Sequence, residues 1–489
     1  MSVHYRETMI PQILSLGQAR VLVLGDIMLD RYISGTVQRM SPEAPVPVVT
    51  PSARWSVPGG AANVAMNISS LGAKVGLICA LFNDEASREI SNSLESENIE
   101  VYGLDAGRPI PVKTRVRTEL QHIVRIDDEQ LQPLHLDDEI LNLVQTLLGN
   151  EDYNLLLISD YAKGLLNEEL FKKLIQLGHD LNVPIITDPK SARPDTYEGI
   201  FLLKPNLVEA QMLLDNEYLV TNPTELADLA REVQEVTKAK NVVVTAASLG
   251  CVLVDSEESY YFPAQQNIEV RDVSGAGDTF ISYIAAGISN GNSVTSACEL
   301  ATLAATLSCT KIGTTPIAPG DLIIAIGSGL TNSSTKFVPH HQLNEVALLL
   351  PRPIVFTNGC FDVIHPGHIE SLEFARSQGS SLIVACNSDQ SVKSLKGEHR
   401  PLQTFETRSR ILAALSSTTI VCELDELTPI RLIEIVKPDV LVKGSDYVNK
   451  EVVGQSFVEE YGGKVVFSPI LEGFSTSNFE ASLLDKPKN

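Results

Sequence analysis

The sequence predicts an α/β protein with two domains, and three observations support this. Strand-like apolar runs alternate with helix-like segments from residue 150 onward, and the same alternation starts again near residue 350. This pattern is typical of parallel sheets covered by helices. Between the two stretches, residues 328–345 are rich in Ser, Thr and Asn, which indicates a linker. We therefore expect domains at residues 1–330 and 349–489, joined by residues 331–348.

Composition argues against several classes of partner. The formal net charge of −23 disfavours non-specific binding to nucleic acid or anionic membrane. No apolar run reaches the length of about 18 residues that a membrane-spanning helix needs, and the N-terminal segment lacks a signal-peptide pattern. The seven cysteines are scattered without CxxC pairs, as is typical of a reducing compartment. We expect a cytoplasmic protein with neither nucleic-acid nor membrane partners.

The first strand is predicted at residues 20–27 (RVLVLGDI), an apolar run typical of a central parallel strand buried on both faces. Asp26 and Asp30 follow at its carboxyl end, where open α/β sheets bind their ligands. The two carboxylates either shape the turn or hold the hydroxyl groups of a sugar.

Two later segments predict a small second sheet. Residues 31–50 combine apolar side chains with prolines, which favours short edge strands over core strands. Residues 111–126 alternate apolar and polar side chains, as a half-exposed antiparallel pair does. We expect these segments to pair outside the main domain, as a lid over the substrate, a dimer contact, or both.

Gly59, Gly60 and Asn63 belong to a glycine turn that opens a helix. Such a turn lets a ligand approach the backbone closely, and an Asn side chain can both donate to and accept from a polyhydroxylated ligand. The alternative is a helix that needs small residues for packing.

Strands predicted at residues 155–158, 183–187, 200–203 and 242–244 all end on polar residues, as a ligand-binding sheet edge requires. After the third strand, Asn206 and Glu209 begin a helix and suit either a hydrated Mg²⁺ or a helix cap. The loop from Thr245 to Gly250 after the fourth strand is a candidate nucleotide contact.

The segment from Asp272 to Phe280 (DVSGAGDTF) is the strongest chemical signal in the first domain. Gly275, Ala276 and Gly277 form a turn whose N–H groups, at a helix N-terminus, suit a phosphate. Asp278 begins the helix and could take a proton from an attacking hydroxyl, the combination that phosphoryl transfer needs. The alternative is an ordinary strand-to-helix turn capped by Asp278.

These motifs, GGAAN, NLVE and DVSGAGD, occur in the order and spacing of the ribokinase-like (PfkB) sugar kinases, which the chain resembles over about residues 15–325. The segments VLVLGDIMLDRY, SPEAPVPVV and PGGAANVAMNISSLGA are most similar to kinases of D-glycero-β-D-manno-heptose 7-phosphate. The resemblance implies a ribokinase-like α/β/α sandwich with a small β-sheet lid, which forms a homodimer contact. Ser274 and Thr302 depart from the usual Thr and Asn of these kinases.

The resemblance also implies the roles of individual residues. Asp278 would be the catalytic base, with Gly275, Ala276 and Gly277 as the anion hole. The sugar would contact Asp26, Asp30, Gly59, Gly60 and Asn63. ATP would contact Asn206, Leu207, Val208, Glu209, Thr245 and Gly250, with Glu209 beside Mg²⁺.

The second domain opens on a strand followed by His365 and His368 at the head of a helix. Both imidazoles and the helix N–H groups can face one phosphate, as nucleotidyl transfer requires. A metal site or a buried core pair is the alternative. Cys360 is expected to be a packing residue, since nothing basic is spaced to activate it.

TNGCFDVIHPGHIESL and LVKGSDY resemble the cytidylyltransferase-like nucleotidyltransferases, over about residues 350–480, and among them the adenylyltransferases of heptose 1-phosphate. The resemblance implies a Rossmann-like domain in which His365, His368 and Arg408 are catalytic, with Arg408 in contact with the ATP phosphates. It places the nucleotide against Thr357, Phe361, Asn387, Asp389, Lys396, Lys443, Ser475, Thr476 and Ser477. Ser445 replaces a Gly of the usual GGDY pattern.

Together the resemblances imply a bifunctional enzyme of ADP-heptose synthesis, for the lipopolysaccharide core, that uses ATP, Mg²⁺ and heptose phosphates. Another sugar kinase joined to a cytidylyltransferase is a second interpretation. A third makes one domain a catalytically inactive regulatory module. The presence of Asp278, His365, His368 and Arg408 argues against the third.

Overall fold

A computed structural model describes residues 9–118, 121–216, 218–264, 268–311, 313–327, 336–445 and 450–469, with only the backbone at residue 122. The chain divides into two compact units. One is formed by residues 15–318, and the other contains residues 9–14 with the described residues from 319 onward. Within the described ranges, no helix has both the length and the apolar character needed to cross a bilayer.

The larger unit is built on a nine-stranded sheet of order β13-β12-β11-β10-β9-β8-β1-β4-β5. The strands from β11 to β5 in this order run parallel, and β12 and β13 add an antiparallel pair at one edge. β1 is buried on both faces, as expected for its continuous apolar run. The strands are β1 (Arg20–Gly25), β4 (Lys74–Leu81), β5 (Glu100–Asp105), β8 (Leu155–Ser159), β9 (Ile185–Thr187), β10 (Leu202–Leu203), β11 (Asn241–Thr245), β12 (Cys251–Val254) and β13 (Ser259–Phe262).

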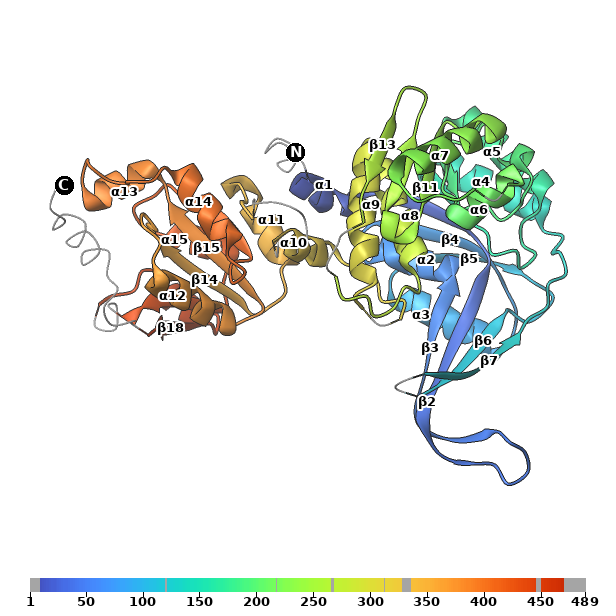
Figure 1. Cartoon of the computed structure of the whole chain (residues 1–489), viewed down its shortest axis with the longest axis horizontal. Coiled ribbons are helices and arrows are strands. Elements are labelled where there is room, and N and C mark those ends of the chain that lie inside the picture. Colours follow the sequence, from blue (N-terminus) through green and yellow to red (C-terminus); the bar gives the residue numbers. More distant parts are fainter. Residues whose placement is uncertain are drawn as a thin grey trace. The chain divides into compact units, whose positions relative to one another are not determined.

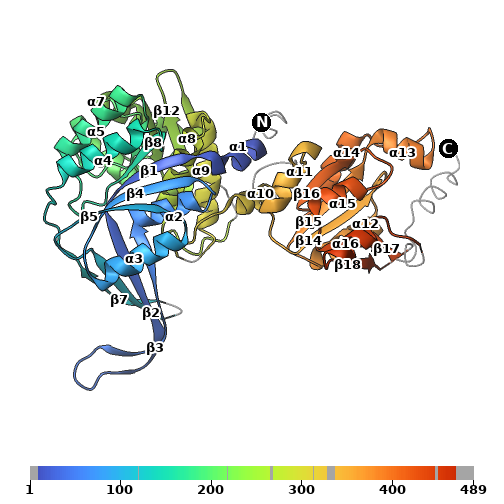
Figure 2. The ribbon, with the colours of Figure 1, turned by 180° about the vertical axis from the view of Figure 1, so that it is seen from behind.

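Helices cover both faces of this sheet (Figures 1 and 2). On one face, α4 to α7 pack against alternate strand residues such as Leu22 and Ile158, while α2, α3, α8 and α9 cover the other. The expected α/β/α arrangement is confirmed. The helices are α2 (Ala61–Ser69), α3 (Glu85–Ser96), α4 (Asp137–Gly149), α5 (Glu168–Leu181), α6 (Leu207–Leu214), α7 (Pro223–Thr237), α8 (Ala276–Ser289) and α9 (Val294–Ser308), with short turns η2 (Leu16–Gln18), η3 (Pro194–Tyr197) and η4 (Ala247–Leu249).

A separate four-stranded sheet has the order β3-β2-β6-β7, from β2 (Ile27–Met40), β3 (Pro47–Gly60), β6 (Val112–Arg117) and β7 (His122–Asp128). β2 pairs antiparallel with β3 and parallel with β6, so the predicted pairing of residues 31–50 with residues 111–126 is confirmed. The expectation of short strands is wrong, because β2 and β3 each span 14 residues. β3 lies at the edge of this sheet, the position at which a strand tolerates proline. Figure 1 shows this four-stranded sheet, hereafter the lid, beside the main sheet, with the hairpin of β2 and β3 extending from it.

The smaller unit contains a five-stranded parallel sheet of order β16-β15-β14-β17-β18. β15 and β16 lie on one side of β14, and β17 and β18 lie on the other, so the strand order reverses at β14. Open sheets bind ligands at the carboxyl ends of the strands at such a reversal. Its strands are β14 (Ile354–Gly359), β15 (Ser381–Asn387), β16 (Ile420–Leu424), β17 (Val440–Gly444) and β18 (Lys464–Ser468), and its helices are α12 (Pro366–Ser377), α13 (Asp389–Lys396), α14 (Phe405–Ala414), α15 (Ile430–Val436) and α16 (Gln455–Glu460).

The remaining elements are α1 (Met9–Ser15), α10 (Pro319–Gly327), η5 (His340–Gln342) and α11 (Leu343–Leu349). The last two fall within the expected linker, so its described part, residues 336–348, is helical over much of its length. Residues 328–335 lie outside the described residues.

Candidate active sites

The glycine turn before α8 has the conformation that its sequence demands. Gly275 has φ +77° and caps the helix, and a Cβ there would lie 3.0 Å from the side chain of Thr314. The carboxylate of Asp272 accepts hydrogen bonds from the N–H groups of Ser274 and Gly313, at 2.9 and 3.0 Å. Because Gly275 caps α8, Asp278 lies in the first turn with its side chain available for other contacts.

Asp278 is held by two donors from other elements. The phenol of Tyr161 donates to Oδ1 at 2.6 Å, and the amide of Asn63 donates to Oδ2 at 2.7 Å. Burial raises the pKa of Asp278, while these two hydrogen bonds and the charges of Lys204 and Lys190 oppose the rise. The carboxylate therefore lies among donors and cations that favour its charged form.

A cavity of about 260 Å³ brings the expected sugar and phosphate residues together. Asp30 and Asn63 line it with Asp278, so residues from β2, α2 and α8 share one space. Its lining also contains Lys113 and Arg115 of β6, two cations that the sequence analysis did not assign. Other predicted residues in the lining are Gly59, Gly60, Gly275 and Gly277.

Asp26 makes different contacts from those expected. Its carboxylate is 5% exposed and accepts hydrogen bonds from the N–H groups of Tyr161, Lys163 and Leu165, at 3.1, 2.9 and 3.2 Å. Both of its oxygens are therefore engaged by the loop after β8. Asp30, in contrast, stays at the cavity and pairs with Arg115.

The expected ATP residues gather at the carboxyl edge of the main sheet. Asn206 and Glu209 form a capping box at the start of α6, and Asn206 forms a parallel bridge with Thr245 at the end of β11. Leu207 and Val208 form the first turn of the same helix. Gly250 has φ +87°, and a Cβ there would lie 2.1 Å from the carbonyl oxygen of Phe262, so the turn requires glycine.

Carboxylates suitable for a hard cation lie near this edge, although in the described ranges no group of three metal-ligating side chains is placed to hold an ion. Glu209 pairs with the Lys190 ammonium and also accepts from the Asn206 N–H. Burial raises the pKa of Asp188 to about 6 despite the nearby Lys204, 3.0 Å away. These oxygen donors fit Mg²⁺ in type, and the structure pairs them with lysines.

The smaller unit contains a cavity of about 420 Å³ at the carboxyl end of β14. Lys443 reaches it from β17 and donates to the side chain of Asn358, so strands on both sides of the reversal contribute to one space. The predicted residues that line it are Thr357, Phe361, His368, Asn387, Lys396 and Lys443.

The two histidines lie together at the start of α12. His365 caps the helix, and the two ring centroids are 3.9 Å apart. Nδ1 of His368 accepts from the backbone N–H of His365 at 3.4 Å, which leaves Nε2 as the protonated nitrogen. Burial, with the charges of His365 and Lys396, lowers the pKa of His368 to about 4, and burial also lowers the pKa of His365. Both rings are thus neutral donors near pH 7.

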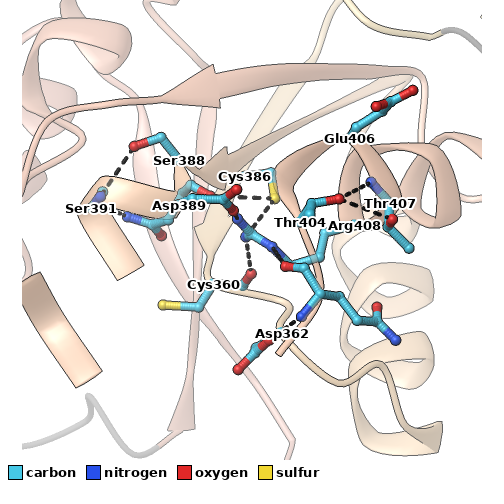
Figure 3. A network of polar contacts seen from close by, with 12 residues as sticks. Cys360, Asp362, Cys386, Ser388, Asp389, Ser391, Thr404, Glu406, Thr407 and Arg408 are labelled. Atoms are coloured by element: carbon cyan, nitrogen blue, oxygen red, sulfur yellow. Dashed lines mark hydrogen bonds and ion pairs between the residues drawn. The ribbon is translucent and has the colours of Figure 1, made fainter. Parts of the chain in front are cut away.

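Arg408 is buried behind the cavity, at the centre of the network in Figure 3. It donates to Asp389 at 2.7 Å, to the carbonyl oxygens of Cys360 and Gln403, and to the sulfur of Cys386. A side chain that was expected to contact phosphate therefore contacts protein groups.

Some expected contacts cannot be placed, because Ser475, Thr476, Ser477 and the last two residues of the GSDY segment lie outside the described residues.

The sequence analysis did not identify three residues that line the cavity beside Asp278: Tyr161, Lys113 and Arg115. Lys113 and Arg115 occupy alternate positions in a strand that was predicted correctly, so the period-2 pattern places both side chains on one face of the strand. The pattern did not indicate that this face is the one that meets the site.

Comparisons with known proteins agree with the division of the chain into two units. Residues 18–320 match the model of the pfkB family carbohydrate kinases, and residues 356–472 match the cytidylyltransferase-like model. Phosphofructokinase-2 from Escherichia coli, solved with potassium, aligns with a TM-score of 0.52 at 21% identity over 62% of this chain and 97% of that one. Ribokinase from Arabidopsis thaliana, solved with ribose and ATP, aligns with a TM-score of 0.51 at 17% identity over 63% and 98%. These likenesses show the fold of the larger unit.

Relatives that align with nearly the whole chain have higher sequence identity. The bifunctional protein HldE of Gluconobacter oxydans is 38% identical over 96% of this chain and 98% of its own length. That of Histophilus somni is 39% identical over 94% and 96%. The chain therefore belongs to the family of bifunctional HldE proteins and carries a pfkB-family carbohydrate kinase followed by a cytidylyltransferase-like nucleotidyltransferase.

Proposed function

We propose that the kinase half transfers the γ-phosphoryl group of ATP to O1 of D-glycero-β-D-manno-heptose 7-phosphate. The second half transfers AMP from ATP to heptose 1-phosphate and yields ADP-heptose and pyrophosphate, for the lipopolysaccharide core. The observation that carries the kinase assignment is one cavity that joins Asp278 and the glycine turn to carboxylate, amide and cationic side chains. A phosphorylated sugar suits such a lining, because it offers hydroxyl groups to some of these residues and negative charge to others.

In the kinase step, Asp278 accepts the O1 proton as O1 bonds to the γ-phosphorus, and the bond from that phosphorus to the β–γ bridging oxygen breaks to release ADP. The N–H groups of Gly275, Ala276 and Gly277 stabilise the charge on the transferred group. Asp30, Gly59, Gly60 and Asn63 contact the sugar, and Asn206, Leu207, Val208, Thr245 and Gly250 contact ATP. Glu209 would lie beside a bound Mg²⁺, which would neutralise charge on the phosphates.

In the adenylyl step, an oxygen of the sugar 1-phosphate bonds to the α-phosphorus and pyrophosphate leaves. The neutral His365 and His368 donate hydrogen bonds to the charge that develops there. Lys396 and Lys443, with Thr357, Phe361 and Asn387, bind the nucleotide. We assign Arg408 to holding Asp389 and the loop at Cys360, and Asp26 to holding the loop after β8. The two steps differ by the 7-phosphate, so a phosphatase acts between them.

We also propose that the chain is a cytoplasmic homodimer. All seven cysteines are free, which supports a reducing compartment. The lid exposes Met40, Val46, Trp55, Val124 and Ile126, and an apolar set of this kind is a candidate contact with a second copy of the chain.

The test separates the two activities in one chain. Incubation with Mg-ATP and a panel of sugar phosphates, with ADP and pyrophosphate measured separately, identifies the substrate of each half. Asp278→Asn should lower sugar phosphorylation by roughly the 10²–10⁴-fold that general-base catalysis contributes, and leave pyrophosphate release intact. His368→Ala should do the reverse. Loss of both activities from either change in folded protein would refute the assignment.

A further inference from the structure

The loop that follows β8 carries a side chain to which the proposed chemistry gives no role. Tyr161 donates to Oδ1 of Asp278 at 2.6 Å, and Asn63 donates to Oδ2 at 2.7 Å. A carboxylate oxygen has two lone pairs, so each oxygen keeps one for a substrate hydroxyl. The two donors fix the plane of the carboxylate and leave it able to accept a proton.

The loop itself is anchored to the neighbouring strand. Asp26 follows β1, which pairs with β8, and its carboxylate accepts the N–H groups of Tyr161, Lys163 and Leu165. Within the loop, Asp160 accepts the N–H of Ala162 at 2.7 Å, and Ala162 has φ +54°. A left-handed non-glycine residue is unfavourable and persists only where its surroundings enforce it. Tyr161 is therefore presented by a backbone with little freedom.

Other charged groups surround the same space. They are Asp30 on β2, Lys113 and Arg115 on β6, Asp160 after β8, Asp188 and Lys190 after β9, and Lys204 after β10. Burial raises the pKa of Asp278, and the Tyr161 hydrogen bond is the strongest of the contacts that oppose this rise. Burial and the Asp278 charge raise the pKa of Tyr161 well above its usual value, so the phenol keeps its proton and stays a donor.

We propose that Tyr161 is a positioning residue of the kinase reaction: it orients the Asp278 carboxylate toward the sugar hydroxyl and stabilises its charged form, and Asp26 holds Tyr161 in place. The proposal rests on the proposed role of Asp278 as the base.

The first test is the pH profile of sugar phosphorylation by full-length Tyr161→Phe, followed by ADP release. Loss of a hydrogen bond to a charged group should move the acid limb of kcat/KM upward by about one pH unit. It should also lower kcat at neutral pH by about tenfold, with little change in the KM for the sugar. The matched control is Tyr153→Phe, because that phenol donates to Glu100 at 2.9 Å and should leave the profile as in the parent. A Tyr161→Phe enzyme with the parent profile and kcat would overturn the proposal.

A second variant tests the anchor. Asp26→Asn should lower kcat and leave the KM for the sugar within about twofold of the parent, since Asp26 acts through the loop. A large rise in that KM with unchanged kcat would instead place Asp26 on the sugar and overturn the anchor. Asp278→Asn distinguishes an error in the role of Asp278 from an error in the role of Tyr161. If it stays active, the proposed base is wrong. If it is inactive while Tyr161→Phe behaves as the parent, only the role of Tyr161 is wrong.

Discussion

Arg408 Nη2 lies 2.7 Å from Asp389 Oδ1, yet the Arg408 side chain is fully buried while that of Asp389 is 41% exposed. The pair therefore joins the interior of the smaller unit to the start of α13, the helix whose last residue, Lys396, lines the cavity. Arg408 also holds the carbonyl oxygen of Cys360, which lines that cavity. Through both contacts, one buried guanidinium sets the position of two parts of the site.

Arg408→Met should therefore lower both stability and adenylyl transfer. Two partly buried carbonyl oxygens lose their donor, and the penalty for each is at most the roughly 1–3 kcal/mol that a fully buried unpaired oxygen costs. We expect lower resistance to urea in the transition of the smaller unit, slower pyrophosphate release and unchanged sugar phosphorylation. Arg410→Met, two residues along α14 and exposed, is the control. A variant with undiminished stability and only a raised KM for ATP would indicate direct phosphate binding instead.

Lys113→Met should weaken binding of the phosphorylated sugar. Lys113 lines the cavity with Asp278, and a hydrogen bond between an ammonium and a phosphate is charge-assisted. We expect the KM for the sugar phosphate to rise about tenfold or more with kcat little changed. Lys172→Met removes a cation that pairs with Asp195 on the surface and should have no effect. An equal loss for an unphosphorylated sugar would show that Lys113 does not contact the phosphate.

Adenylyl transfer should not require a protonated histidine. The pKa of His368 is lowered to about 4, so the free enzyme carries a neutral ring from about pH 8 to pH 5.5, and kcat/KM reports the free enzyme. The ratio of parent kcat/KM to that of His368→Gln should therefore be constant over this range. A ratio that increases about tenfold for each unit of falling pH would show that the imidazolium is the active form.

The double change Val124→Glu with Ile126→Glu should dissociate the proposed dimer. Both side chains are exposed on β7, and burial of each at a contact would contribute about 1.5–3 kcal/mol. Sedimentation should show the dissociation constant rising by about a hundredfold or more. Leu219→Glu introduces one such carboxylate at an exposed position outside the lid and should leave the assembly unchanged. A dimer that survives the double change uses another surface.

The sheets were predictable because their signals are local. Apolar runs such as residues 20–25 reveal buried parallel strands, and Gly275 reveals a turn that only glycine adopts without strain. The lid pairing also followed from period-2 alternation. The length of its strands did not, because the pairing of β2 with β3 continues through two register shifts and through the prolines of an edge strand.

Contacts between distant segments were the ones that could not be predicted. Asp26 and Tyr161 are 135 residues apart, and nothing in either segment specifies the other. Arg408 is a residue type that is mostly exposed, so its sequence position suggested a phosphate contact and not a buried one. In both cases the sequence predicted that a charged side chain contacts substrate. The fold instead brings backbone or side-chain groups from distant segments close enough to form its hydrogen bonds.

The two long lid strands join the core without intervening loops: only Asp26 separates β1 from β2, and β3 ends at Gly60, which caps α2. A hinge at either junction would have to rotate backbone dihedrals beside Asp26 or Asn63. Rotation at either junction would therefore disturb the contacts of Asp26 or Asn63, whereas bending within the β2–β3 hairpin would leave them unchanged. Insertions for engineering belong at the distal tip, residues 41–46, where added length leaves the root untouched.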